Sequence, residues 1–302
     1  MNNSATCPTE RAALQISPAL LERLACPDCR GRLTTGGGGL SCTSCQREFP
    51  VAAEGTLPIL FSPDSEFFSR EHDYGAWRRP EQTPVNLKSY RSSRRLPQTS
   101  VSAITDAAWV RYLQAIAGKW VLNAGSGTHL IRSNLEHCVN LDICPHSNVE
   151  VVGDAHHLPF ADESFDAAIY QAVFAHLRNP FQAASEIIRV LRPGGLVWCT
   201  VPFAHPVCRA PRDFFRFSPD GLQSIFDGLS VVELQASGGP FRVIARYAEN
   251  AAEALFPGKL GSAALWLVAW SLQPFKYFDD ALVKRSPECA SAFYFVARKP
   301  GG

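Results

Sequence analysis

The sequence predicts an α/β fold: a Rossmann-like, seven-stranded, mostly parallel sheet with helices on both faces, plus a small N-terminal zinc ribbon. From about residue 107 onward, short apolar runs typical of strands alternate with segments of helical periodicity, as in parallel sheets. Two Cys-x-x-Cys pairs stand near the N-terminus. The 302 residues are 46% hydrophobic and 19% charged, which excludes a disordered chain or a disulfide-stabilised mini-protein.

Charge and hydropathy narrow the class of protein. The formal net charge of +1 disfavours a strongly basic nucleic-acid binder, although a local basic patch stays open. The first fifteen residues lack the pattern of a secretory signal. The longest apolar run, residues 263–272, is shorter than the roughly 20 residues that span a bilayer. We therefore expect a soluble, cytoplasmic enzyme with no transmembrane segment.

Four of the ten cysteines form two knuckles, Cys26 with Cys29 and Cys42 with Cys45. In a chain without a secretory signal, this spacing is typical of zinc and not of disulfides. Four thiolates complete a tetrahedral zinc and leave no open coordination position. We therefore expect a structural zinc that holds a small module together.

The composition divides the chain into three stretches. Residues 1–61 contain a short helix and the zinc ribbon, residues 62–106 form a linker or basic arm, and residues 107–302 form the α/β domain. A helical insertion at about residues 238–287 precedes the last strand. Between residues 78 and 95 the arm carries six Lys or Arg and one acid. This charge run is compatible with two interpretations, a solvated surface or a patch that binds phosphate or RNA.

The expected elements follow from the apolar periodicity. Ser17 and Pro18 predict the start of the N-terminal helix, because Ser caps helices and Pro suits their first position. The expected strands cover residues 119–124, 138–141, 149–152, 165–170, 196–201, 230–235 and 291–297. The expected helices cover residues 108–117, 180–191, 219–226, 243–255 and 263–272.

Glycines and acids follow three successive predicted strands. Gly125 and Gly127 follow the first strand, where missing side chains let backbone amides approach a nucleotide-like ligand. Asp142 ends the second strand, where a carboxylate can accept hydrogen bonds from two ribose hydroxyls, and Asp154 follows the third. The carboxyl ends of parallel strands meet at one edge of a sheet, so we expect the ligand there.

On these motifs, residues from about 109 to 299 resemble the class I S-adenosylmethionine-dependent methyltransferases of the small-molecule type. The resemblance rests on residues 121–127, 140–142, 152–160, 165–169 and 186–195. Separately, residues 20–61 resemble the zinc-ribbon module that occurs as a free-standing methyltransferase activator and as an N-terminal extension of some methyltransferases. The resemblance implies S-adenosylmethionine as methyl donor and zinc as a structural metal.

The resemblance also implies which residues contact the cofactor. The loop after the first strand would pack against the methionine moiety, the acid after the second would hold the ribose, and the acid after the third would face the adenine. The residue just past the fourth strand would line the methyl-donor pocket. In chain order these residues are Asn123, Gly125, Ser126, Gly127, Asp142, Asp154, Ala155 and Gln171.

The chain departs from the family pattern at three points. Asn123 replaces the acidic residue common at the end of the first strand, and the third glycine of the loop is absent. Only seven residues separate Asp142 from Glu150, too few for the usual crossover helix. We expect this short crossover to leave the adenine side more open.

Three titratable residues are candidates for the acceptor site. Methyl transfer is an in-line displacement from an activated sulfonium, so the protein mainly positions the acceptor and removes its proton. His205 and His176 both follow strand ends, and His205 is the stronger candidate for a base. Asp213, with Arg216 and three phenylalanines beside it, either orients the substrate or forms a surface ion pair.

Three functions are compatible with these motifs. The first is a methyltransferase for a small-molecule biosynthetic intermediate, favoured by the low net charge and the long insertion. The second is a zinc-ribbon RNA methyltransferase, acting on a ribosomal RNA base, in which residues 78–95 grip the nucleic acid. The third is a catalytically silent scaffold. The insertion is predicted to be core, a substrate lid, a homodimer face or a shallow membrane contact.

Overall fold

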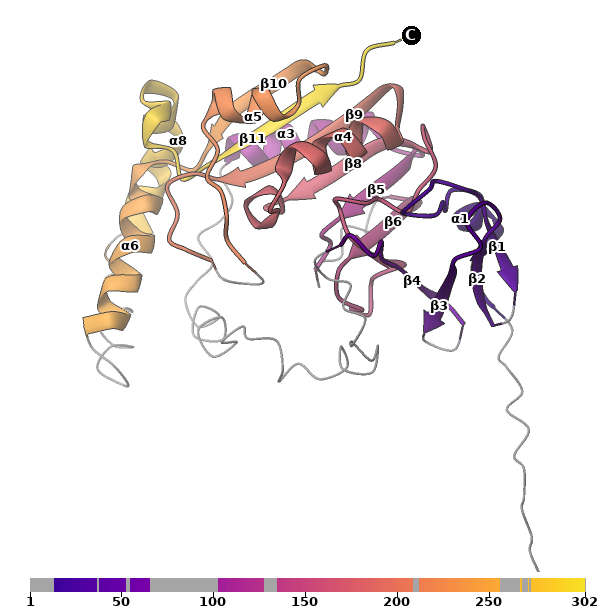
Figure 1. Ribbon diagram of the computed structural model, residues 1–302. Coiled ribbons are helices and arrows are strands. Elements are labelled where there is room, and N and C mark those ends of the chain that lie inside the picture. The colour runs from indigo at the N-terminus through magenta and orange to yellow at the C-terminus, as the bar shows by residue number, and fades with distance from the viewer. Residues whose placement is uncertain are drawn as a thin grey trace, which may run out of the picture.

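The computed structural model describes residues 14–36, 38–52, 55–65, 103–127, 135–208, 212–255, 267, 271 and 273–301. These residues form one sheet of eleven strands, in the order β1-β2-β3-β4-β7-β6-β5-β8-β9-β11-β10 (Figure 1). Among the described residues, no helix is both long enough and apolar enough to cross a membrane.

Seven of the strands come from the part of the chain predicted to be the α/β domain. Neighbouring strands from β7 through β6, β5 and β8 to β9 are parallel, and β11 lies antiparallel between β9 and β10. The predicted Rossmann-like class is therefore confirmed. The strands are β5 (Trp120–Ala124), β6 (His137–Asp142), β7 (Val151–Gly153), β8 (Phe165–Gln171), β9 (Leu191–Pro202), β10 (Ser230–Ser237) and β11 (Ala292–Arg298).

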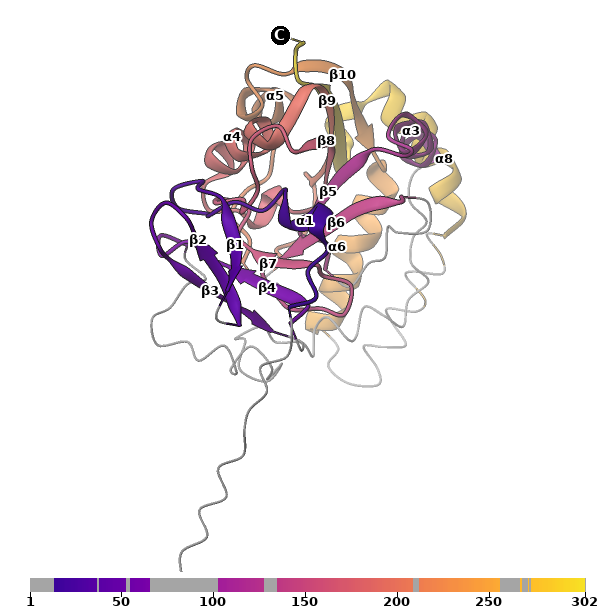
Figure 2. The same ribbon diagram turned by 90° about the vertical axis from the view of Figure 1, so that its right-hand side faces the viewer.

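The sheet has more than the seven strands expected because the N-terminal module adds four. These are β1 (Leu33–Gly36), β2 (Gly39–Cys42), β3 (Glu48–Ala52) and β4 (Leu57–Leu60). The first three pairings, from β1 to β4, are antiparallel hairpins. β4 then pairs in parallel with β7, with Ile59 opposite Val152. Figure 2 shows the ribbon strands continuing the sheet past β7.

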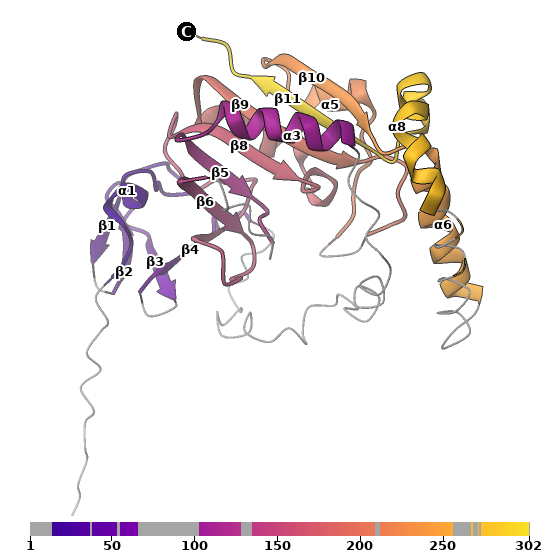
Figure 3. The same ribbon diagram turned by 180° about the vertical axis from the view of Figure 1, so that it is seen from behind.

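Helices cover both faces of the sheet. α4 (Pro180–Val190) and α5 (Pro219–Ile225) lie on one face, and α3 (Ala103–Ala115) lies on the other (Figures 1 and 3). α6 (Pro240–Leu255) and α8 (Lys276–Arg285) lie side by side beyond the edge where β8 and β9 end. The short elements are α1 (Pro18–Leu21), η4 (Phe174–His176), η5 (Gln273–Phe275) and η6 (Pro287–Cys289).

The helix expected at residues 108–117 is present but begins five residues earlier, at Ala103, and ends at Ala115. Ser17 caps α1 as expected, accepting a hydrogen bond from the Leu20 amide (3.2 Å). Most of residues 62–106, including the basic segment 78–95, lies outside the described residues. Of the helix expected at residues 263–272, the structure describes only Leu267 and Ser271, both helical.

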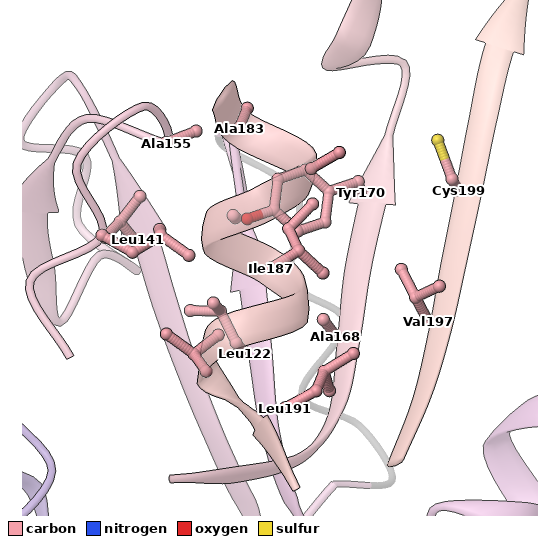
Figure 4. Packing of buried hydrophobic residues seen from close by; sticks show 14 of the residues in the cluster. Leu122, Leu141, Ala155, Ala168, Tyr170, Ala183, Ile187, Leu191, Val197 and Cys199 are labelled. Atoms are coloured by element: carbon pink, nitrogen blue, oxygen red, sulfur yellow. The ribbon is translucent and has the colours of Figure 1, made fainter. Parts of the chain in front are cut away.

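Alternation along the buried strands separates two apolar layers. On β8, Ala168 and Tyr170 face α4, while Ala167 and Ile169 belong to the cluster that includes α3. Ile187 of α4 lies over the first layer (Figure 4). Period-two alternation on a strand buried on both faces therefore gives each helix layer its own apolar surface.

The zinc ribbon shares its core with the α/β domain. Leu24 forms an antiparallel bridge with Phe160, and the Ala25 amide donates to the Pro159 carbonyl (3.0 Å). The Arg23 guanidinium lies 3.5 Å from the centre of the Trp120 ring, a cation–π contact. These contacts fix the ribbon on the domain through both backbone and side chains.

The shared core predicts that a substitution in the domain destabilises both modules. Phe160 is fully buried in the cluster that contains residues of both. We expect Phe160→Ala to lower the free energy of unfolding by about 3–5 kcal/mol, because it leaves a cavity. Urea denaturation followed by tryptophan fluorescence measures this loss. The exposed Phe181→Ala is the matched control, and equal stability of the two variants would contradict a shared core.

Candidate active site and metal centre

The four predicted metal ligands converge. The sulfur atoms of Cys26 and Cys45 lie 3.7 Å apart, those of Cys29 and Cys42 lie 3.4 Å apart, and all four lie within 4.8 Å of one another. Tetrahedral zinc with Zn–S bonds of about 2.3 Å places its sulfurs about 3.8 Å apart. The cluster therefore has the size and donor set that structural zinc requires.

The two knuckles repeat one backbone pattern. Arg30 and Gln46, which follow the second cysteine of each pair, have φ of 60° and 61°, in the left-handed region. Their amides donate to the carbonyls of Cys26 (2.9 Å) and Cys42 (3.0 Å). At Gly31, a Cβ would lie 2.5 Å from the Ser44 hydroxyl, so only glycine lets the second knuckle approach. This local geometry forms each pair of ligands from a short tight turn.

We expect protein purified without added metal to contain about one zinc per chain. Cys29→Ser should abolish this content and lower the melting temperature, because a ribbon this small depends on its metal. Metal analysis and thermal melting measure both effects, with the exposed Cys289→Ser as control. Metal-free protein with four freely titrating thiols would contradict the assignment.

The glycine loop after β5 has the shape of a ligand cradle. Gly125 has φ of +65°, and a Cβ there would lie 2.4 Å from the Val173 side chain. Gly127 has φ of +53°, and a Cβ there would meet no atom of the described part of the chain within 4 Å. The first glycine thus admits the neighbouring loop, whereas the second faces open space.

A second observation supports a ligand at this loop. The Ser126 hydroxyl is buried, with 5% of the residue exposed, and it has no hydrogen-bond partner among the described residues. Buried polar groups in native proteins are nearly always satisfied, so an orphaned hydroxyl indicates a missing partner. Together with the space at Gly127, it fits the methionine end of S-adenosylmethionine.

Asp142 connects this loop to the end of β6. Its Oδ2 accepts a hydrogen bond from the Gly127 amide (2.8 Å) and its Oδ1 accepts one from the Cys144 amide (2.9 Å). A carboxylate offers about four acceptor positions, so two stay available for ribose hydroxyls. The structure thus places Asp142 beside the glycine loop, as the predicted ribose contact requires.

Asn123 does not point its amide at the loop. Its Nδ2 donates to Oδ1 of Asn140 (2.7 Å) across the β5–β6 pairing, and the Asn140 Nδ2 donates to the Asn148 carbonyl (2.9 Å). Both amides are buried. The residue that replaces the family's acid therefore holds the short crossover against the sheet.

Asp154 is almost fully buried, with 1% exposed, and both of its oxygens have partners. Oδ1 accepts from the amide and the ring of His156 (2.9 and 2.7 Å), and Oδ2 accepts from the Ser65 hydroxyl (2.5 Å). Burial alone would raise the pKa of Asp154, but these hydrogen bonds outweigh it and lower the pKa. The structure therefore turns this carboxylate toward the chain that follows β4, and the next residue, Ala155, is also buried.

The loop after β8 is a part of the site whose backbone the sequence did not predict. Gln171 ends β8 and is exposed at the carboxyl edge. Ala172 has φ of +59°, which is rare for a residue with a Cβ, and its amide donates to the Thr200 carbonyl (2.9 Å). Residues with such strained backbone conformations cluster at functional sites. No sequence signal indicates a positive φ here, because the residue is an alanine.

The rings of His205 and His176 are each oriented by a hydrogen bond from one ring nitrogen to a backbone carbonyl. Nδ1 of His205 donates to the Pro206 carbonyl (2.8 Å), and Nδ1 of His176 donates to the Arg212 carbonyl. In this tautomer each Nε2 keeps a lone pair. Burial lowers the pKa of His205 below its ordinary value, and the Arg246 and Arg216 guanidiniums act in the same direction.

Asp213 and Arg216 form a partly buried ion pair, in which the Asp213 side chain is 4% exposed and the Arg216 side chain 25%. Arg216 donates to both carboxylate oxygens, and the Asp213 Oδ2 also accepts from the Cys208 amide (2.6 Å). Burial alone would raise the pKa of Asp213, yet these hydrogen bonds hold it below its ordinary value. Arg216 also donates to the His205 and Pro206 carbonyls (3.4 and 3.1 Å), so the ion pair fixes the loop that carries His205. A role of Asp213 in orienting the substrate stays a prediction.

Comparison with known proteins agrees with this architecture. Residues 122–199 match the family described as Methyltransferase domain, and residues 17–52 match the family of Trm112p-like proteins. The chain therefore carries a methyltransferase domain and a Trm112p-like zinc ribbon. Both predicted cofactors, S-adenosylmethionine and structural zinc, are consistent with these two matches.

Particular relatives are similar over part of their length. A demethylmenaquinone methyltransferase of Paenarthrobacter aurescens is 38% identical over 65 residues, 22% of this chain and 25% of that protein. The ubiquinone/menaquinone biosynthesis C-methyltransferase UbiE of Roseobacter denitrificans is 32% identical over 137 residues, 37% of this chain and 54% of that protein. The chain thus spans between a quarter and about half of these relatives.

Solved structures with a similar fold include the Haloferax volcanii complex of the Trm112 methyltransferase activator with its methyltransferase. That structure is 18% identical, with a TM-score of 0.43, and the likeness covers 72% of this chain and 96% of that one.

We expect Asp142→Asn to weaken binding of S-adenosylhomocysteine at least about tenfold, since a hydrogen bond to a charged group contributes about 1.5–3 kcal/mol. Isothermal titration calorimetry measures this affinity. Asp227→Asn, at an exposed acid, is the matched control and should bind normally. Unchanged affinity in a folded Asp142 variant would place the ribose elsewhere.

Proposed function

We propose that this chain is an S-adenosylmethionine-dependent methyltransferase that acts on a small-molecule biosynthetic intermediate. The observation that carries the proposal is the glycine loop at the carboxyl edge of the sheet. It has open space at Gly127 and an unsatisfied Ser126 hydroxyl, and the Gly127 amide donates a hydrogen bond to Asp142. S-adenosylmethionine has a methionine end and ribose hydroxyls, which are the groups that this edge would bind.

The acceptor side is proposed to lie over the loop that follows β9. Phe214 and Phe215 are 36% and 39% exposed there, and the Phe215 ring lies 5.7 Å from that of the buried Phe217. An exposed aromatic surface favours an acceptor with an apolar part. The quinone methyltransferases among the relatives are consistent with such a molecule.

His205 is proposed to remove the acceptor's proton. The bound sulfonium supplies an activated methyl group, and the acceptor loses a proton when it takes that group. The Nδ1 hydrogen bond to the Pro206 carbonyl orients the ring and leaves the Nε2 lone pair for this proton. Because burial lowers the pKa of His205, the basic form predominates at neutral pH.

Replacing His205 tests this role. We expect His205→Gln to lower kcat about 100-fold or more, in the range usual for a general base, and to leave the Kd of S-adenosylhomocysteine unchanged. His137→Gln, which removes a ring stacked on Trp120 at the opposite edge, is the matched control. An unchanged kcat in His205→Gln would contradict the role of His205 as the base.

The pH profile gives a second readout for the same group. The base acts when unprotonated, so activity should persist as pH falls through 6.5 and decline only at the lowered pKa of His205. An acid-side inflection above pH 6.5 would contradict this assignment.

The other sequence-based hypotheses stay proposals. We propose the division into residues 1–61, 62–106 and 107–302. The insertion at residues 238–287 is proposed to be core, a substrate lid, a homodimer face or a shallow membrane contact. We also propose a cytoplasmic location, because none of the nine described cysteines forms a disulfide and a reducing compartment keeps thiol ligands reduced. Salt-dependent RNA binding through residues 78–95 would instead support the RNA methyltransferase.

A further inference from the structure

A second group of metal-ligating side chains lies beside the glycine loop. Asp142, Cys144 and His146 offer a carboxylate oxygen, a thiol sulfur and a ring nitrogen, all within 4.8 Å of one another. Within the described part of the chain, only this group and the four cysteines of the ribbon converge in this way. The group is separate from the ribbon centre in sequence and in donor chemistry.

The short crossover brings the three side chains together. β6 ends at Asp142 and β7 begins at Val151, with no helix between them. The Cys144 amide donates to Asp142 (2.9 Å), and the His146 amide donates to the Cys144 carbonyl (2.9 Å). These hydrogen bonds hold the three residues in one tight turn.

The far end of the turn is also fixed. The Val149 amide donates to the His146 carbonyl (3.0 Å), and Asn140 donates from its side chain to the Asn148 carbonyl (2.9 Å). The Glu150 amide and carboxylate both bond to the backbone of Asn140 (2.9 and 2.8 Å). Ligands on a backbone held at both ends are pre-organised, which reduces the entropic cost of binding an ion.

The donor set selects the kind of ion. A thiolate and an imidazole disfavour magnesium and calcium, which take oxygen ligands, and favour zinc and similar borderline ions. Three protein ligands leave one position of a tetrahedral ion open. We propose that Asp142, Cys144 and His146 bind one zinc ion and that this ion competes with the adenosyl cofactor.

Competition follows from the shared carboxylate. Each Asp142 oxygen already accepts one backbone N–H, from Gly127 or Cys144, so only its remaining lone pairs can serve a ligand. Ribose hydroxyls and zinc would need the same lone pairs. Zinc binding forms bonds to the three side chains and releases the Cys144 thiol proton to solvent. The competition, unlike the metal site itself, rests on the proposed function.

Zinc titration into the full chain that already carries its ribbon zinc tests the site. We expect a second zinc equivalent by calorimetry, with metal analysis after gel filtration. Cys144→Ser and His146→Gln should each weaken it by more than the roughly tenfold that loss of an outer-shell partner costs. Cys289→Ser, at an exposed cysteine outside the group, should bind it normally. No second equivalent, or an unchanged one in both variants, would overturn the site.

Binding of S-adenosylhomocysteine tests the competition. At a free zinc concentration ten times its own Kd, the apparent Kd for S-adenosylhomocysteine should rise about elevenfold, and Cys144→Ser should remove this rise. An unchanged or lowered Kd with zinc bound would overturn the competition. If protein that carries only its ribbon zinc fails to bind S-adenosylhomocysteine while the second zinc still binds, the proposed function fails and the metal site stands.

Discussion

The parallel pairing of β4 with β7 is the contact on which the rest of the structure most depends. β7 has only three residues, all buried, and the crossover before it contributes no helix to cover it. An uncovered strand of this kind would expose apolar side chains and unpaired backbone groups. All four residues of β4 are buried, and Ile59 and Leu60 pair with Val152 and Gly153 of β7. A Cβ at Gly153 would lie 3.3 Å from the Leu60 carbonyl oxygen, so a glycine there permits the close pairing. The zinc ribbon is therefore part of the sheet that carries the candidate site.

Strong local patterns predicted most of the sheet. Alternating apolar residues located all seven strands of the α/β domain, and Cys-x-x-Cys spacing located the metal ligands. The predicted boundaries of helices and strands were less accurate where residues that end a helix also pair with a distant strand. The helix expected at residues 180–191 ends at Val190, and the turn-forming residues 193–195 follow it. β9 nevertheless begins at Leu191 and not at residue 196, because Leu191 already pairs with Phe165. Turn residues can end a helix without delaying the strand that follows.

Side-chain orientation at the site was beyond prediction because distant residues determine it. Asp154 lies at the expected strand end, but Ser65, 89 residues away, takes one of its oxygens. Asn123 was expected among the cofactor contacts, yet its side-chain amide hydrogen-bonds Asn140 and so supports the crossover. Neither partner has a motif of its own. A sequence pattern locates the polar residue, whereas the fold decides which group it faces.

One short segment, residues 172–176, contacts both the glycine loop and the loop that follows β9. After β8, the strained Ala172 turns the chain so that Val173 packs on Gly125, which must lack a side chain there. Three residues later the ring of His176 bonds to the Arg212 carbonyl, and the Ala175 carbonyl accepts from the Phe214 amide (2.8 Å). The glycine loop and the loop that follows β9 thus both contact the same few residues. In-line transfer requires donor and acceptor to be aligned closely, and a shared support fixes their relative position better than two separate loops would.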